Sequence, residues 1–365
     1  MSRGRLARDL HPVAWWLWAI GLAAAASATT NPLSLLLLVG VAALAVGLRR
    51  SDQPWGASFR LYVWLGVAIV VIRVVFRVVF GGGSNGTVLL DLPAVPLPEA
   101  AAGIVLLGPV TLESLLAGAY EGLRLATIVI CVGAANSLAN PKRLLRSVPP
   151  ALYEVGTALV VAVSVLPQLA DSVQRVRAAQ SLRAAPAAGR VGSLRRFLVP
   201  VLEDALERSL ALAAGMDTRG YGRSGDASPA RRRVTGALML TGLCGVCVGV
   251  YAGLDQEAPR WLATPMLLLG VAVAVLGTVS AGRRVERSRY RPDRWRTPEL
   301  LVVAAGVVVA VLGQWVARQQ PLVALPRLDA VPTVSLAVLL GAGVALLGAV
   351  ASPPTRVTAP GVVTA

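Results

Sequence analysis

The sequence predicts an all-α fold: a polytopic α-helical membrane protein with about eight transmembrane helices and a cytoplasmic amphipathic insert. Of its 365 residues, 55% are hydrophobic, and the mean hydropathy is +0.67. Several apolar runs reach the roughly 17–25 residues that a helix needs to cross a bilayer. The positive charges, which give a net charge of +16, lie in the loops between these runs. Membrane proteins with positive cytoplasmic loops show this distribution, so we expect a lipid bilayer and no nucleic acid as partner.

The apolar runs justify the expected helices one by one. The eight predicted spans cover residues 13–28, 33–48, 61–80, 111–138, 234–251, 264–281, 300–316 and 334–350. Ala26-Ser27-Ala28 resembles a signal-peptide cleavage site, but three tryptophans near residue 15 are typical interface anchors. We therefore interpret the first run as an uncleaved span.

The distribution of positive charge predicts which loops face the cytoplasm, for a protein expected in the plasma (inner) membrane. Residues 140–233 carry fifteen Lys and Arg against seven acidic residues, and the loop 283–296 carries seven arginines. The loop 81–103 has neither Lys nor Arg. Placing the two basic segments and the N-terminus in the cytoplasm requires eight spans, in agreement with the count. The predicted division is N-terminal membrane helices (1–139), cytoplasmic or interfacial helices (140–233) and C-terminal membrane helices (234–365).

The insert begins with a run, 151–167, that is apolar enough to suggest a ninth span. A crossing there would move the following arginines to the outside, against the charge rule. We interpret it as a helix in or under the inner leaflet, broken at Pro149-Pro150 and at Pro167. A second amphipathic helix follows Pro200, carries an Asp204–Arg208 pair on its polar side and ends at Gly220 and Gly222.

Each amphipathic helix of the insert ends close to an arginine. Arg183 lies in Gln-Ser-Leu-Arg-Ala and Arg219 in Gly-Met-Asp-Thr-Arg-Gly-Tyr-Gly. Attraction of a cation to the negative end of a helix dipole explains either arginine singly. A pair of such ends, each with a small neighbour, also suits docking into another protein, because a guanidinium can bind carboxylates or carbonyls in a fork.

The segments PKRLLRSVPPALYEVGTALVVAVSVLPQLADSVQRVRAAQ and LERSLALAAGMDTRGYG resemble the transmembrane (T) component of energy-coupling factor transporters, the EcfT/CbiQ family. The resemblance covers about residues 1–282. It implies two helices that cross under the membrane, each with a motif arginine in a groove of one of two cytoplasmic ABC ATPase subunits. The expected function is coupling of these ATPases to a membrane-embedded substrate-binding S component, for vitamin or metal-ion uptake, without a cofactor.

The motif residues implied by the resemblance are Leu182-Arg183-Ala184 and Thr218-Arg219-Gly220. The first departs from the usual Ala-Arg-Gly, because alanine replaces the glycine. Alanine tolerates a left-handed turn less well, so the first helix is expected to continue past Arg183 towards Pro186. The last two spans resemble an extension beyond the minimal family architecture.

The alternative to a coupling subunit is a self-contained secondary transporter. Its transport pathway would contain four charged residues of the predicted spans: Arg73, Arg77, Glu113 and Glu121. A charge inside a membrane span is energetically costly and is often kept for function. The presence of the same four residues is also explained if they form ion pairs that only stabilise the fold. A membrane enzyme is disfavoured: the chain has one histidine, no Gly-Lys-Ser/Thr phosphate loop and no nucleophile–base pattern. Cys244 and Cys247 have metal-ligand spacing but no second Cys or His pair, so no metal site is expected.

Overall fold

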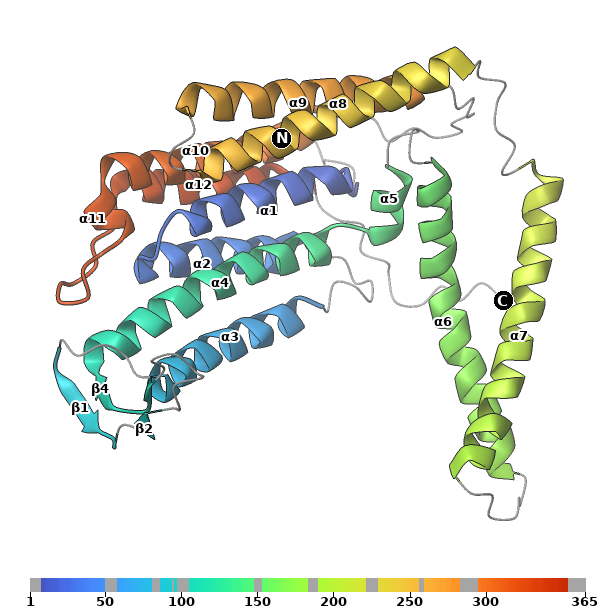
Figure 1. Ribbon diagram of the computed structural model, residues 1–365, viewed down its shortest axis with the longest axis horizontal. Helices are drawn as coiled ribbons and strands as arrows, with labels where there is room; N and C mark the ends of the chain where they lie inside the picture. The colour runs from blue at the N-terminus through green and yellow to red at the C-terminus, as the bar shows by residue number, and fades with distance from the viewer. Residues whose placement is uncertain are drawn as a thin grey trace, which may run out of the picture. The chain divides into compact units, whose positions relative to one another are not determined.

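The computed structural model describes residues 8–49, 58–80, 86–93, 95–96, 105–147, 153–182, 190–220, 229–255, 259–282 and 295–353. The chain divides into two compact units, each considered by itself. The first unit combines Met1–Leu144 with Pro292–Ala365, and the second is Leu145–Arg291. Figure 1 shows the elements of each.

The first unit contains the helices α1 (Pro12–Ser27), α2 (Pro32–Arg49), α3 (Phe59–Val79), α4 (Leu112–Leu138), α10 (Thr297–Gln319), α11 (Pro321–Ala324) and α12 (Leu336–Ala351). Its short strands are β1 (Val88–Asp91), β2 (Val95–Pro96), β3 (Val105–Leu106) and β4 (Pro109–Thr111). β1 pairs with β4 and β2 with β3, both antiparallel. The second unit contains α6 (Tyr153–Leu182), α7 (Arg190–Thr218), α8 (Pro229–Leu254) and α9 (Arg260–Gly282), and α5 (Pro141–Arg146) connects the units in sequence.

The predicted all-α membrane fold is confirmed. Within the described residues, seven helices are long and apolar enough to cross a membrane: α2, α3, α4, α6, α8, α9 and α10. Six of them coincide with predicted spans. The first and last predicted spans form α1 and α12, apolar helices of 16 residues each, which rise about 24 Å and fall short of a typical hydrocarbon core. The seventh candidate is α6, which the sequence placed at the membrane surface.

The prediction that α6 breaks at Pro167 is wrong. The helix is continuous from Tyr153 to Leu182 with Pro167 inside it. Proline removes one backbone donor and crowds the preceding turn, which costs a hydrogen bond and favours a kink. Here the helix continues for more than ten residues on each side of the proline, so the loss of one hydrogen bond does not end the helix. The predicted break at Pro149-Pro150 lies outside the described residues.

The core of the first unit forms around α1. This helix packs against α10 and α4, while α12 packs against α10 and α2. Trp18 and Leu22 of α1 are fully buried, and the Trp18 indole donates to the carbonyl oxygen of Ala345 in α12 at 3.3 Å. A Cβ added to Gly21 would overlap the carbonyl oxygen of Gly306 in α10. The backbones therefore touch, as they do where small residues line helix contacts in membranes.

A buried amide fixes the turn between α1 and α2. The side chain of Asn31 is fully buried, and its Nδ2 donates to the carbonyl oxygens of Val323 at 2.8 Å and Thr333 at 2.7 Å. Its Oδ1 accepts from the backbone N–H of Leu33 at 3.0 Å. These bonds satisfy the polar atoms of a group that would be costly to bury unpaired. The C-terminal spans are thus part of the core of this unit.

The helices of the first unit have two distinct ends. At one end Arg8 pairs with the fully buried Glu299 in the first turn of α10, and Arg143 lies 3.9 Å from Asp9. The strands lie at the other end, beside the C-terminus of α3, and α11 lies at that end next to α10 (Figure 1). The Glu299 side chain also accepts from the backbone N–H of Arg296 at 3.1 Å, which satisfies one free donor at the start of α10.

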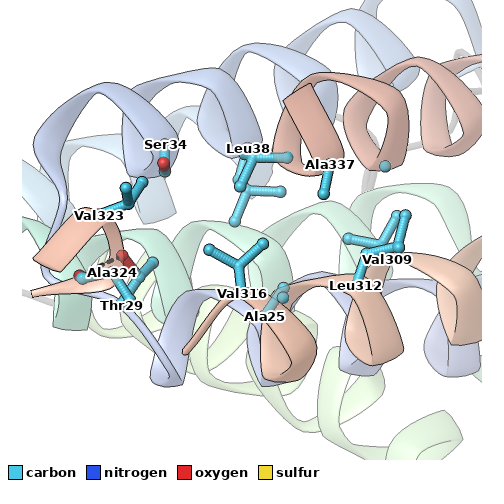
Figure 2. A pocket seen from close by; sticks show the side chains of 13 residues that line it. Ala25, Thr29, Ser34, Leu38, Val309, Leu312, Val316, Val323, Ala324 and Ala337 are labelled. Carbon is cyan, nitrogen blue, oxygen red and sulfur yellow. Dashed lines mark hydrogen bonds between the residues drawn. The ribbon is translucent and has the colours of Figure 1, made fainter. Parts of the chain in front are cut away.

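A small cavity of about 30 Å³ lies inside this bundle, between α1, α2, α10, α11 and α12. Figure 2 shows that aliphatic side chains such as Leu38, Val309 and Val316 point into it. Thr29 and Ser34 contribute the hydroxyl groups of the lining. The volume is close to that of a single water molecule, so we assign the cavity no ligand.

The second unit contains a tightly packed helix pair, α8 and α9. Added Cβ atoms at Gly242 and Gly249 of α8 would lie 2.5 Å from backbone nitrogens of α9, those of Ala274 and Leu267. The two backbones therefore run in contact over about two helical turns. The side chains of Cys244 and Cys247 are exposed on α8.

Candidate functional site

The helices α6 and α7 form a hairpin whose contacts lie close to the loop that joins them. Asp204 of α7 is the centre of these contacts. Arg208, one turn further along α7, donates to Asp204 Oδ1 from Nε at 3.2 Å and from Nη2 at 3.1 Å. Arg175 of α6 reaches the same carboxylate, with Nη2 3.4 Å from Oδ2. The predicted Asp204–Arg208 pair is confirmed, and it also binds the two helices together through Arg175.

The environment of Asp204 favours its ionised form. A hydrogen bond from Ser172 of α6 is the largest cause that lowers the pKa of Asp204 below its ordinary value. Hydrogen bonding and charge attraction from Arg208, and attraction from Arg175, act in the same direction. The carboxylate is therefore charged at neutral pH and holds two arginines and a serine from two helices.

Two further contacts join the helices near the loop. Gln180 Nε2 donates to the carbonyl oxygen of Arg196 at 2.8 Å. The guanidinium carbon of Arg177 lies 5.7 Å from the centre of the Phe197 ring, within cation–π distance. Beyond these contacts α6 and α7 diverge, as Figure 1 shows. The hairpin is thus a V held together near its apex by polar groups.

The diverging parts of both helices expose apolar side chains. On α7, Leu202, Leu206 and Leu210 recur every four residues and are each exposed by more than 60%. On α6, Val155 and Leu166 are exposed to a similar degree. The second predicted helix therefore has the apolar face of an amphipathic helix, and the hairpin's own contacts leave these leucines uncovered.

Leu182, the first residue of the first arginine motif, lies at the apex of the V. Leu182 is the last residue of α6, and its side chain is 87% exposed. Arg183 and Ala184 lie outside the described residues, as does the predicted continuation of the helix towards Pro186. The apex thus presents a large apolar side chain next to the first motif arginine in sequence.

The second motif lies at the far end of α7. The helix ends at Thr218, whose hydroxyl donates to the carbonyl oxygen of Gly215 at 3.0 Å. Gly220 has φ +74°, and its N–H donates to the carbonyl oxygen of Asp217 at 2.9 Å. This left-handed glycine ends the helix, as the sequence predicted for Gly220, and Arg219 is exposed beside it. Gly222 lies outside the described residues.

The hairpin places the two motifs apart. Gln180 contacts Arg196 beside the apex, whereas Thr218 lies at the other end of α7. A helix rising 1.5 Å per residue covers about 33 Å between Arg196 and Thr218. The described parts of the two motifs, Leu182 and Thr218–Gly220, therefore lie at opposite ends of the hairpin's second helix.

The charged residues of the alternative hypothesis lie in the first unit. Glu121 of α4 pairs with Arg77 at 3.2 Å and with Arg73 at 3.6 Å, both from α3. Glu113 accepts from the backbone N–H of Thr87 at 2.9 Å and from its hydroxyl at 3.2 Å. Glu113 thus holds the strand end in place, and the four residues form two separate groups.

Sequence reasoning missed Arg175, Ser172 and Glu299. The two residues of α6 could not be found, because a contact between helices depends on their crossing geometry. Glu299 lies in the first turn of α10, where an acidic residue is favoured, and this was a usable signal for its place at the helix start. Among the described residues, no three His, Cys, Asp or Glu side chains gather as a metal site would require.

Comparison with known protein families supports the resemblance inferred from the two arginine-bearing segments. The family model described as "Cobalt transport protein" (CbiQ) matches residues 3–229. No curated protein sequence matches the chain. The match includes α1 to α7 and both motifs but stops at the start of α8, so it is shorter than the expected 1–282. Because it covers more than half of the chain, this multi-pass membrane protein belongs to the cobalt transport protein (CbiQ) family, the EcfT/CbiQ family of transport proteins.

Proposed function

We propose that the chain is the transmembrane coupling subunit of an energy-coupling factor ABC importer. It connects two cytoplasmic ABC ATPases with a membrane-embedded S component that captures a vitamin or a metal ion. The exposed end of α7 carries the proposal: Arg219 lies beside a left-handed glycine, at the tip of a helix in a family of transport proteins. The proposed ATPase-coupling residues are Leu182-Arg183-Ala184 and Thr218-Arg219-Gly220.

The shape of the α7 end suits a docking knob. Gly220 has no Cβ, and no heavy atom lies within 4 Å of where one would be. A groove wall can therefore approach the backbone closely, while the guanidinium of Arg219 binds carboxylates or carbonyls deeper in the groove. Docking covers these exposed groups without any rearrangement of α7.

The exposed leucines of α7 support a second contact. Leu202, Leu206 and Leu210 form a stripe that the hairpin itself leaves uncovered. We assign this stripe, together with the apolar residues of α6, to the S component. Movement of the ATPases changes the angle between α6 and α7, because the bonds described between these helices, such as Arg175–Asp204 and Gln180–Arg196, lie near the apex. That change tips the S component between orientations.

The secondary-transporter alternative has less support. Arg73 and Arg77 are paired with Glu121, and Glu113 is engaged by Thr87. The carboxylates thus have partners that suit a structural role.

Co-purification tests the proposal. Tagged protein is isolated from its own membranes in mild detergent, and bound ATPases are identified by labelling with a photoreactive ATP analogue. Arg219→Glu should remove them, since loss of a buried, paired arginine contact costs about 2–5 kcal/mol of interface energy. Arg195→Glu, an exposed arginine near the apex of the same helix, is the matched control. Full ATPase recovery with Arg219→Glu would refute docking at this end.

Transport gives the second readout. Uptake of radioactive cobalt, the ion in the family's description, is measured in cells with and without the chain. Uptake that needs both this chain and ATP hydrolysis supports the coupling role. Uptake that continues without any ATPase, driven by a proton gradient, would support the secondary transporter instead.

A further inference from the structure

The helix α3 differs from the other helices of the first unit in how little of it is covered. Gly66 is its one buried residue, and its main packing partner is α4. The outward side chains of Val71, Val75 and Phe76 are each about half exposed. An apolar helix face of this kind, in a membrane protein, contacts either lipid or another membrane helix.

Three charges interrupt this apolar surface. Arg73 and Arg77 of α3 share the Glu121 carboxylate of α4, at 3.6 and 3.2 Å. Their side chains remain 48%, 39% and 37% exposed, in the order Arg73, Arg77, Glu121. Two guanidinium groups and one carboxylate leave one net positive charge, and two guanidinium groups offer more donors than one carboxylate accepts. The group therefore has room and charge for one more anion.

Two glycines hold the arginines in place. A Cβ on Gly118 would lie 2.8 Å from Arg77 Cγ, and one on Gly122 would lie 3.2 Å from Arg73 Cβ. The arginine stems thus lie directly on the backbone of α4, which limits the conformations that they adopt. A pair of cations fixed in this way loses little entropy when it binds an anion.

The position of the pair along the helix favours a lipid headgroup as the anion. Arg77 lies two residues before the end of α3 at Val79, and Arg73 lies one turn earlier. At 1.5 Å per residue these positions are about 3 and 9 Å from the helix end. Long arginine side chains reach the phosphate layer from this depth, while an acyl chain lies along the apolar residues below.

We propose that Arg73, Arg77 and Glu121 form a binding site for the phosphate of an anionic phospholipid, in the leaflet on the side of the β1–β4 strand pair. The phosphate binds the guanidinium donors that Glu121 leaves unused. A lipid with one net negative charge neutralises the group, whereas a zwitterionic lipid adds an ammonium beside two arginines. Phosphatidylglycerol is therefore preferred over phosphatidylethanolamine.

Native mass spectrometry of the purified chain tests this site. Delipidated protein is titrated with phosphatidylglycerol and, separately, with phosphatidylethanolamine. Replacing both arginines, Arg73→Gln with Arg77→Gln, should weaken phosphatidylglycerol binding by roughly 25-fold, at about fivefold for each arginine near a headgroup. Phosphatidylethanolamine binding should change much less.

The variant Glu121→Gln distinguishes two explanations of the three charges: a lipid-binding site, and ion pairs that only stabilise the fold. It frees both guanidinium groups, so phosphatidylglycerol should bind more tightly than to the wild type. Arg318→Gln is the matched control, because Arg318 lies in the last turn of α10, at the same end of the bundle (Figure 1). It should leave lipid binding unchanged, and thermal unfolding in detergent checks that every variant is folded.

Several results would overturn the proposal. Unchanged phosphatidylglycerol binding in the double variant would exclude the arginines as the site. An equal loss with Arg318→Gln would show general attraction to headgroups instead of a site. Weaker binding with Glu121→Gln would mean that the three charges only support the fold. Loss of a co-purifying membrane protein from the double variant, with lipid binding intact, would assign the site to a partner's carboxylate.

Discussion

The α1–α10 contact and the α6–α7 hairpin represent two different ways of holding helices together. In the first, the backbones touch through Gly21 and Gly306, and the surrounding side chains are buried. In the second, a few charged and polar groups around Asp204 join helices whose apolar faces remain exposed. Close packing of small residues suits a rigid scaffold, whereas a polar hinge with uncovered apolar faces suits a part that moves against partners. Under the proposed function, the first contact belongs to the fixed part of the chain and the second to the part that moves.

Membrane topology is the sharpest test of this separation, because the result is all or none. We expect α6 and α7 to lie on the cytoplasmic side, although α6 is long and apolar enough to cross. Cysteines are introduced at the exposed Ser181 and Ser209, after Cys244 and Cys247 are replaced by alanine. An impermeant thiol reagent should label them only in permeabilised cells, while Asp91→Cys near β4 should be labelled in intact cells. Labelling of Ser181→Cys in intact cells would show that α6 spans the membrane.

Overpacking of the rigid region should have the next largest effect. Gly21→Leu forces a side chain into the space that the backbone of Gly306 occupies, since even a Cβ at Gly21 would overlap the Gly306 carbonyl oxygen. The expected loss is about 3 kcal/mol of stability, at the upper end for overpacked cores. Thermal unfolding in detergent measures it. Gly40→Leu is the control, because no atom lies within 4 Å of its Cβ position, and an equal loss there would contradict this account.

The two motif arginines should differ in importance. Thr218-Arg219-Gly220 has the left-handed glycine, whereas Leu182-Arg183-Ala184 has alanine at the equivalent place. Alanine disfavours that backbone turn by roughly 1 kcal/mol, so docking at the first motif is expected to be weaker. Arg219→Ala should therefore reduce recovery of ATPases more than Arg183→Ala, at matched membrane expression. Equal losses, or a larger one for Arg183→Ala, would mean that the missing glycine has no effect.

A low pH should weaken the contact between α6 and α7, with a smaller effect than the three changes described above. Because the folded-state pKa of Asp204 is lowered, its ionised form stabilises the contact at neutral pH. That stabilisation is lost as the pH falls below the ordinary value of about 3.9 and through the lowered pKa. Spin labels at Gln168 and Ser209 should then report a broader distance distribution. Asp204→Asn should be broad at all pH values, with Asp217→Asn as control; a pH response that persists in Asp204→Asn would assign it to another group.

Local features of the chain could be predicted from the sequence, whereas contacts between distant segments could not. The length of the apolar runs predicted six of the long helices, and the conformational freedom of glycine predicted the end of α7 at Gly220. The Asp204–Arg208 pair follows from i,i+4 spacing alone. The predicted break at Pro167 was wrong, because a proline can either end a helix or kink it, and the sequence does not distinguish these two outcomes. The partners of Glu121 and Asn31 depend on how helices cross, which no local pattern encodes.

The buried amide of Asn31 has a consequence for how the chain is made. Its partners Val323 and Thr333 follow it by 292 and 302 residues. At the usual 5–20 residues per second, a ribosome needs about 15–60 s to synthesise that distance. During this time α1 and α2 exist without α10 and α12, the later helices that pack against them. The Asn31 amide therefore gains these two hydrogen-bond partners only when nearly the whole chain has been synthesised.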